Sequence, residues 1–240
     1  MKIHPFVEAV ASLQFEDCFN PYSDRCEVHD RRDAPRRRAA ALSAMLRRAT
    51  EEPVDAIWIG RDLGYRGGRR TGLALTDDVH IDQHAKRWDL DLIAERPTIG
   101  SAVAERTAAV IWGMLEHIDA RIFLWNVFPL HPHESGEPFT NRQHNAQERR
   151  AGEELLHQLI VLLKPSRIVA IGNDAAAAAH RVPARPEKAS APAPIATGLR
   201  ECGRAATVAS CATSGATCSG QCRARQRQAA VAAPLVNGAY

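Results

Sequence analysis

The chain has 240 residues, of which 45% are hydrophobic and 25% charged, with a formal net charge of +3. This length is enough for one α/β domain with a sizeable core. No run reaches the roughly 18 apolar residues that a membrane helix needs, and the N-terminus lacks the apolar stretch of a secretory signal. We therefore expect a cytoplasmic protein with no membrane partner.

The predicted elements alternate between helices and short apolar strands. In chain order they are a helix over 36–50, a strand over 56–60, a helix over 101–119, a strand over 120–129, a helix over 146–164, a strand over 167–172 and a helix from 173 capped by Asn173 or Asp174. Several glycines between residues 60 and 68 exclude a long helix directly after the first strand. The alternation predicts a three-layer α/β/α fold with a central parallel sheet.

The C-terminal part of the chain has a different composition. Residues 180–240 carry eight Lys or Arg, two Asp or Glu and 16 alanines, and Tyr240 is their only aromatic residue. Acidic residues slightly outnumber basic ones in residues 1–179, so the net charge says little about nucleic-acid binding. We expect one folded domain over residues 1–179 and a disordered Ala/Arg/Pro-rich tail over residues 180–240.

Metal binding is not expected from the cysteines or the histidines. The pair Cys218 and Cys222 has no second close pair with metal-ligand spacing. The histidines at 131, 133 and 144 share one polar loop, and nothing in their spacing fixes a coordination geometry.

Asp62 lies just past the end of the first predicted strand, and Asn126 lies at the carboxyl end of the second. Ligands of parallel sheets bind at the carboxyl ends of the strands, so these two residues are considered together. A carboxylate such as Asp62 can orient or deprotonate a water, although a turn or helix-cap aspartate is the simpler interpretation. The Asn126 amide can donate and accept, which suits the O4/N3 edge of uracil, or it can satisfy local backbone groups.

Five stretches together resemble the uracil-DNA glycosylase superfamily, in a less familiar bacterial branch, over about residues 15–178. They are FNPYSDRC (19–26), IGRDLGYRGGRRTGLALTDD (59–78), ERTAAVIW (105–112), LWNVFPLHPHESGEPFTNR (124–142) and KPSRIVAIGNDA (164–175). The resemblance implies a parallel four-stranded sheet between helices, whose first motif follows the first strand. The fourth strand has no clear counterpart in this sequence, and we expect it to be missing.

The resemblance assigns roles to individual residues. Gly60 begins the first motif, and Asp62 matches the water-activating aspartate of the best-known members. Gly64 stands where those members have a tyrosine that blocks the 5-position of the base, and Leu75 stands where a base-stacking phenylalanine is expected. Asn126 matches the amide that reads the flipped base. The departures at Gly64 and Leu75 imply loose selectivity for uracil.

Further contacts are expected within the same motif. Arg61 and Tyr65 are expected to contact the substrate, and three arginines are expected to contact DNA phosphates, namely Arg66, Arg69 and Arg70. The implied reaction is base flipping followed by cleavage of the glycosidic bond, which leaves an abasic site. No cofactor or metal is required. The expected partner is uracil-containing DNA, bound by a monomer.

The second motif of the family, a His-Pro pair after the fourth strand, is absent from the sequence after Ala179. Its histidine donates to O2 of the leaving base in the family. We hypothesise that the gene is read out of frame from near residue 180, with a natural disordered tail as the alternative. Translation of the other two frames past Ala179 should reveal a strand followed by His-Pro, and the hypothesis is wrong if neither frame contains one.

Two other functions stay open at this stage. A glycosylase-like module that binds DNA without turnover would explain the missing second motif, and release of free base would separate it from an enzyme. A dinucleotide-binding domain is disfavoured because GRDLGYRGG has Asp62 where Gly-x-Gly-x-x-Gly needs its second glycine.

Overall fold

The computed structural model describes residues 2–91, 95–182 and 195–197 of the chain. Its centre is a parallel sheet in the order β3-β2-β5-β6. The strands are β2 (Ala56–Asp62), β3 (Ile122–Phe128), β5 (Arg167–Ala170) and β6 (Ile195–Thr197). The helices that flank the sheet are α1 (Pro5–Ala11), α2 (Ala34–Glu51), α4 (Ile81–Trp88), α6 (Arg106–Leu115), α7 (Ala146–Leu163) and α8 (Asn173–Arg181).

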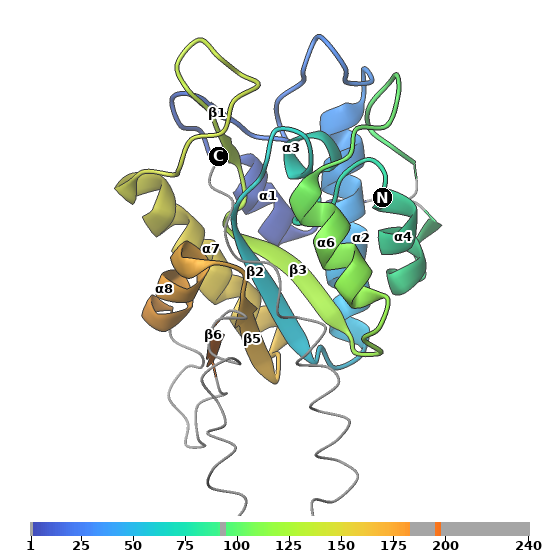
Figure 1. Cartoon of the computed structure of the whole chain (residues 1–240), viewed down its shortest axis with the longest axis vertical. Helices are drawn as coiled ribbons and strands as arrows, with labels where there is room; N and C mark the ends of the chain where they lie inside the picture. The colour runs from blue at the N-terminus through green and yellow to red at the C-terminus, as the bar shows by residue number, and fades with distance from the viewer. Residues whose placement is uncertain (1, 92–94, 183–194, 198–240) are drawn as a thin grey trace, which may run out of the picture.

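Helices cover both faces of the sheet, which confirms the predicted three-layer α/β/α fold (Figure 1). Ile57 and Ile59 of β2 pack with α1, α2 and α7 on one face. Trp58 and Leu124 pack with α6 on the other face, where Trp112 is buried. Because both faces are covered, the central strands are continuous apolar runs rather than alternating ones.

The predicted elements agree with the structure in type and differ at their ends. Strand β2 extends two residues beyond the predicted 56–60 and includes Asp62. Helix α6 begins later than predicted, because Glu105 has extended backbone angles and serves as its N-cap. The predicted cap of α8 by Asn173 or Asp174 is wrong, because Gly172 occupies the N-cap position with φ of 93°.

The sequence did not predict several elements. Helices α1 and α4, the four-residue helix α3 (Gly68–Thr71) and the antiparallel pair of β1 (Cys18–Phe19) with β4 (His131–Pro132) are additional. The expectation that the fourth strand is missing is wrong, because β6 pairs in parallel with β5 over three residues. Helix α8 runs past the expected domain boundary at residue 179. The rest of the tail, 183–194 and 198–240, lies outside the described residues.

None of the helices in the described part of the chain has the length and apolarity of a membrane span.

The loop between β2 and α3 closes around the side chain of Glu105. A Cβ atom built on Gly64 would lie 2.1 Å from Glu105 Oε1, and one on Gly67 would lie 2.0 Å from Glu105 Oε2. The backbone N–H of Glu105 also donates to Asp77 Oδ2 at 2.6 Å. Burial raises the pKa of Glu105 to about 7, the charge of Asp77 adds to this, and Arg66 opposes it.

Replacement of Glu105 by Gln should remove a pH dependence of stability. An unfolded glutamate ionises near its ordinary pKa of 4.5, whereas folded Glu105 keeps its proton to about pH 7. The folded state therefore binds more protons, and the free energy of unfolding should fall as pH rises between these two values. At pH 8 the Glu105→Gln variant should be more stable than the original chain by about 2 kcal/mol.

Urea denaturation at pH 5 and pH 8 would measure this difference. The matched control is Glu116→Gln, because Glu116 is an exposed glutamate just after α6 whose carboxylate contacts Gln83. The same pH dependence in the Glu105→Gln variant and in the control would contradict the assignment.

Candidate active site

The parallel register of β2 and β3 sets Gly60 directly beside Asn126. A Cβ on Gly60 would lie 2.9 Å from Leu75 Cδ2 and 3.0 Å from Asn126 Nδ2. Leu75 is held at a φ of 53°, in the left-handed region, and its carbonyl accepts a 3.2 Å bond from Trp112 Nε1. Three of the predicted site residues, Gly60, Leu75 and Asn126, thus converge at the carboxyl end of the sheet.

Asn126 is 1% exposed and its amide is fixed from one side only. Its Nδ2 donates to the carbonyl oxygen of Asp62 at 2.7 Å, which sets the orientation of the amide. Its Oδ1 is buried and has no hydrogen-bond partner among the described residues. A buried acceptor without a partner is costly, and the hydrogen-bonding capacity of this oxygen is unused among the described residues.

Asp62 is the last residue of β2, and its side chain is 6% exposed. Arg61 Nε donates to Oδ2 at 2.7 Å, and Oδ1 pairs with Nδ1 of His144. Arg61 also lies 3.6 Å from Asp174 at the start of α8. The carboxylate therefore has a cationic partner on one oxygen and an imidazole on the other.

His144 is the partner of Asp62 that the sequence did not predict. It immediately precedes Asn145, the N-cap of α7, whose Oδ1 accepts from the backbone N–H groups of Gln147 and Glu148. Glu148 Oε2 accepts from the backbone N–H of Asn145 at 2.7 Å, which completes a capping box. The Asn-x-x-Glu spacing was a signal in the sequence that His144 stands at a helix start, but it could not reveal that Asp62 lies opposite.

The three loop histidines do not form a metal site. His131 donates from Nδ1 to the carbonyl of Leu63 at 2.7 Å, and burial lowers its pKa to about 4, so the ring is neutral. Within the described residues no three His, Cys, Asp or Glu side chains are grouped as metal ligands.

The glycine-rich loop brings Tyr65 and Arg66 toward the surface, where Tyr65 is half-buried and Arg66 is exposed. The Tyr65 backbone N–H donates to Asn141 Oδ1 at 3.0 Å. Arg66 is exposed, and its Nε donates to the Tyr65 hydroxyl at 2.8 Å while the guanidinium lies 5.4 Å from the ring centre. The space beside Gly64 is filled by Glu105.

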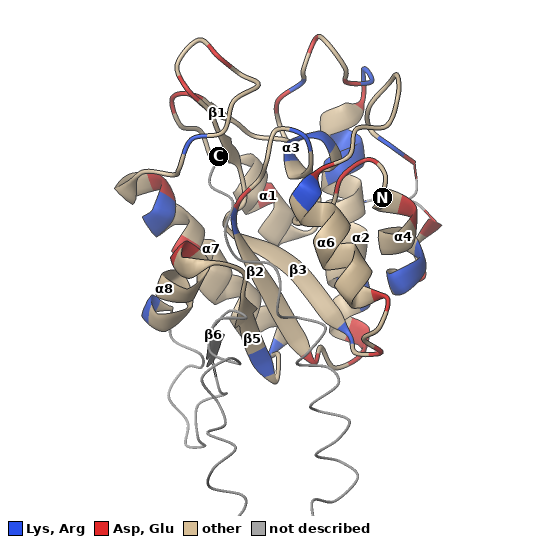
Figure 2. Ribbon diagram, viewed as in Figure 1, with Lys and Arg blue, Asp and Glu red and all other residues tan. Residues whose placement is uncertain are grey.

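Arg69 and Arg70 are buried, which speaks against the predicted phosphate contacts. The Arg69 guanidinium lies between Phe19 and Phe139, 4.1 Å and 4.9 Å from the ring centres. Arg70 forms a buried ion pair with Asp78, with Nε–Oδ2 at 2.8 Å. Figure 2 shows basic residues on α3 near the carboxyl end of β2. The side chains of Arg69 and Arg70 are nevertheless buried, and they hold α3 in place.

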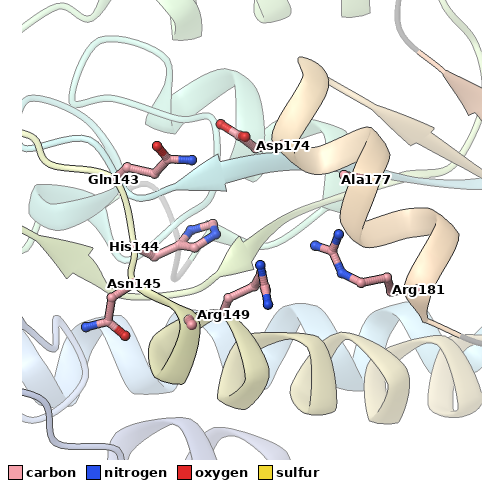
Figure 3. A pocket seen from close by; sticks show the side chains of 8 residues that line it. Gln143, His144, Asn145, Arg149, Asp174, Ala177 and Arg181 are labelled. Carbon is pink, nitrogen blue, oxygen red and sulfur yellow. The ribbon is translucent and has the colours of Figure 1, made fainter.

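A pocket opens between the start of α7 and one side of α8 (Figure 3). It is lined by Gln143, His144, Asn145, Ala146, Arg149, Asp174, Ala177 and Arg181. His144 belongs both to this lining and to the pair with Asp62. The pocket is therefore adjacent to the carboxylate at the end of β2.

Comparison with known proteins finds similar solved structures and one matching family. No match was found among curated protein sequences. The crystal structure of wild-type Pedobacter heparinus SMUG2 is similar at 12% sequence identity and a TM-score of 0.45, over 80% of this chain and 86% of the other.

The family match covers most of the chain. The description of the matching family is "Uracil DNA glycosylase superfamily", and the match spans residues 54–231. It includes β2, the glycine-rich loop and Asn126, and it extends beyond residue 178, where the motif resemblance was expected to end. With this match over more than half of its length, the chain belongs to the uracil DNA glycosylase superfamily.

Proposed function

We propose that this chain is a DNA glycosylase that flips uracil out of DNA and hydrolyses its N-glycosidic bond, leaving an abasic site. The observation that carries this proposal is the buried Asn126 amide with an unpaired acceptor, fixed through Nδ2 to the backbone of Asp62. It puts a group that can read a base next to a carboxylate that can direct a water.

Recognition of the base would use the fixed Asn126 amide. Its free Oδ1 can accept from N3–H of uracil, and the second hydrogen of Nδ2 can donate to O4. Gly60 has no side chain in this space, and Leu75 supplies an apolar wall against a planar base. A leucine stacks less specifically than an aromatic ring, so we propose that other deaminated bases are also accepted.

Hydrolysis would use Asp62. As the bond between C1′ and the base nitrogen breaks, its electron pair leaves with the base and positive charge develops on the sugar. The carboxylate stabilises that charge and orients the water whose oxygen bonds to C1′, and the proton that this water loses ends on the departing base. Its two oxygens each have a protein partner, yet a carboxylate has lone pairs for further hydrogen bonds.

Contact with the DNA backbone would use the exposed end of the glycine-rich loop. Arg66 is exposed and stacked on Tyr65, which limits the freedom that the side chain loses when it binds a phosphate. We propose Arg66 as a phosphate contact, Tyr65 and Arg61 as substrate contacts, and a monomer as the acting form. Arg69 and Arg70 are buried and do not reach a phosphate from their positions in α3.

A DNA-binding module without turnover is the second candidate. It is favoured by the absence of a His-Pro pair after Ala179, since a donor to O2 of the leaving base would be lost with it. Such a module would bind uracil-containing DNA and release no free base.

Replacement of Asp62 by Asn should lower the rate of uracil release roughly 10²- to 10⁴-fold, because a neutral amide neither stabilises the charged sugar nor accepts a proton. The measurement is single-turnover release of uracil from a single-stranded oligonucleotide, beside DNA affinity by fluorescence anisotropy. Affinity should change little.

The matched control is Asp82→Asn, since Asp82 is an exposed aspartate on α4. Release of uracil at the same rate by both variants would contradict the role of Asp62. DNA binding without uracil release by the unchanged chain would favour the second candidate.

Replacement of Arg66 and of Arg70 by Ala should have different consequences. Arg66→Ala should weaken DNA binding and reduce the slope of log affinity against log salt by about one, as expected for one lost phosphate contact. Arg70→Ala removes the closest cationic partner of the buried Asp78, which leaves Arg96 at 3.8 Å, and should reduce the free energy of unfolding by about 3 kcal/mol.

Salt titrations of DNA binding and urea denaturation would test both changes. The two assignments are contradicted if the Arg70→Ala variant is as stable as the unchanged chain and if it, rather than Arg66→Ala, shows the reduced salt dependence of DNA binding.

A further inference from the structure

The carboxylate of Asp62 is held by two different side chains at the edge of the sheet. Arg61 Nε donates to Oδ2 at 2.7 Å, and Arg61 is its sequence neighbour on β2. The partner of Oδ1, His144, comes from a loop 82 residues further along the chain. The side chains of Asp62 and His144 are only 6% and 5% exposed, so water competes little for this contact.

The position of His144 is set by contacts that do not involve Asp62. Asn145 begins α7 through the capping box with Glu148. Arg142, on the other side of His144, donates to both oxygens of the fully buried Glu148, at 2.8 Å and 2.6 Å. The imidazole also packs edge-on against Phe128, with ring centres 6.2 Å apart. The ring is therefore brought to Asp62 by the fold of the loop.

The chemistry of the contact fixes the direction of its hydrogen bond. A carboxylate only accepts hydrogen bonds, so Nδ1 of His144 carries the proton and donates it to Oδ1. An imidazole in this position restricts rotation of the carboxylate about its last bond. The Asp62 carboxylate must face both a water and C1′, so restricting its rotation should raise the rate of hydrolysis. A displacement of a catalytic group by about 1 Å can lower the rate roughly 10²-fold.

We infer that His144 is a positioning residue for Asp62: its Nδ1–H holds the carboxylate in the orientation that directs the hydrolytic water, from the wall of the pocket between α7 and α8. This inference rests on the proposed function. It also gives His144 a role other than the donor role of the family's second motif, because its Nδ1 is committed to Asp62.

A purely structural pair would have the same contacts. It would tie the start of α7 to the end of β2, and its loss would lower stability without a specific effect on the chemical step. The positioning role and the purely structural role predict different rates of uracil release in two cases. One is a variant of His144 that restores an N–H donor, and the other is a variant of His144 in a chain that already lacks the Asp62 carboxylate.

The test is a double-mutant cycle on the full chain with a single-stranded oligonucleotide carrying one uracil, measured under single-turnover conditions. His144→Phe keeps a planar ring and removes the donor, and it should lower the rate of uracil release roughly 10²-fold while KM changes little. His144→Asn restores an N–H donor and should recover most of that loss. In the Asp62→Asn background, His144→Phe should cause no further loss, because the group it positions is gone.

The control is His117→Asn, since His117 is exposed just beyond the end of α6 and precedes the start of β3, whereas Asn126 lies toward the other end of that strand. Thermal unfolding of each variant identifies any that fail to fold, and His144→Asn decides the outcome if His144→Phe does. An active chain in which His144→Phe keeps the full rate, or in which its effect multiplies with that of Asp62→Asn, overturns the positioning role alone. No uracil release by the unchanged chain overturns the proposed function, and the positioning role with it.

Discussion

The parallel pairing of β2 with β3 is the constraint on which the rest of the site depends. It sets Gly60 beside Asn126 and ends both strands at the same edge of the sheet. A slip of one residue would turn Asn126 to the opposite face and separate it from Leu75 and from the carbonyl of Asp62. The small size of Gly60 matters for the same reason, since a Cβ atom there would collide with both neighbours.

Buried ion pairs hold the long loops that follow the strands. Arg38 of α2 pairs with Asp30 with both side chains fully buried, and its Nε reaches the carbonyl of Arg70 at 2.8 Å. Arg142 pairs with the fully buried Glu148 and so holds the loop before α7. Buried charges are tolerated only when paired, and a pair fixes two segments at once. Arg69 and Arg70 of the first motif are likewise buried in structural contacts, although the sequence suggested contacts with DNA.

The side chains of Asp62 and Asn126, at the carboxyl edge of the sheet, differ in how many of their hydrogen bonds are made. Both oxygens of the Asp62 carboxylate have protein partners, whereas the Asn126 amide keeps one buried acceptor without a partner in the described residues. The first arrangement fixes the orientation of a charged group. The second leaves one buried acceptor whose hydrogen bond is not made within the described residues.

The sequence by itself determined the layer architecture, the three central strands and the two strand ends that carry Asp62 and Asn126, because apolar periodicity and glycine placement are local signals. It did not determine β6, where a short apolar stretch becomes a strand only by pairing with β5. The burial of Arg69 and Arg70 and the pairing of His144 with Asp62 were decided by tertiary structure alone. Local sequence cannot specify such contacts, because their partners lie up to 82 residues away and are brought together only when the sheet and its loops pack.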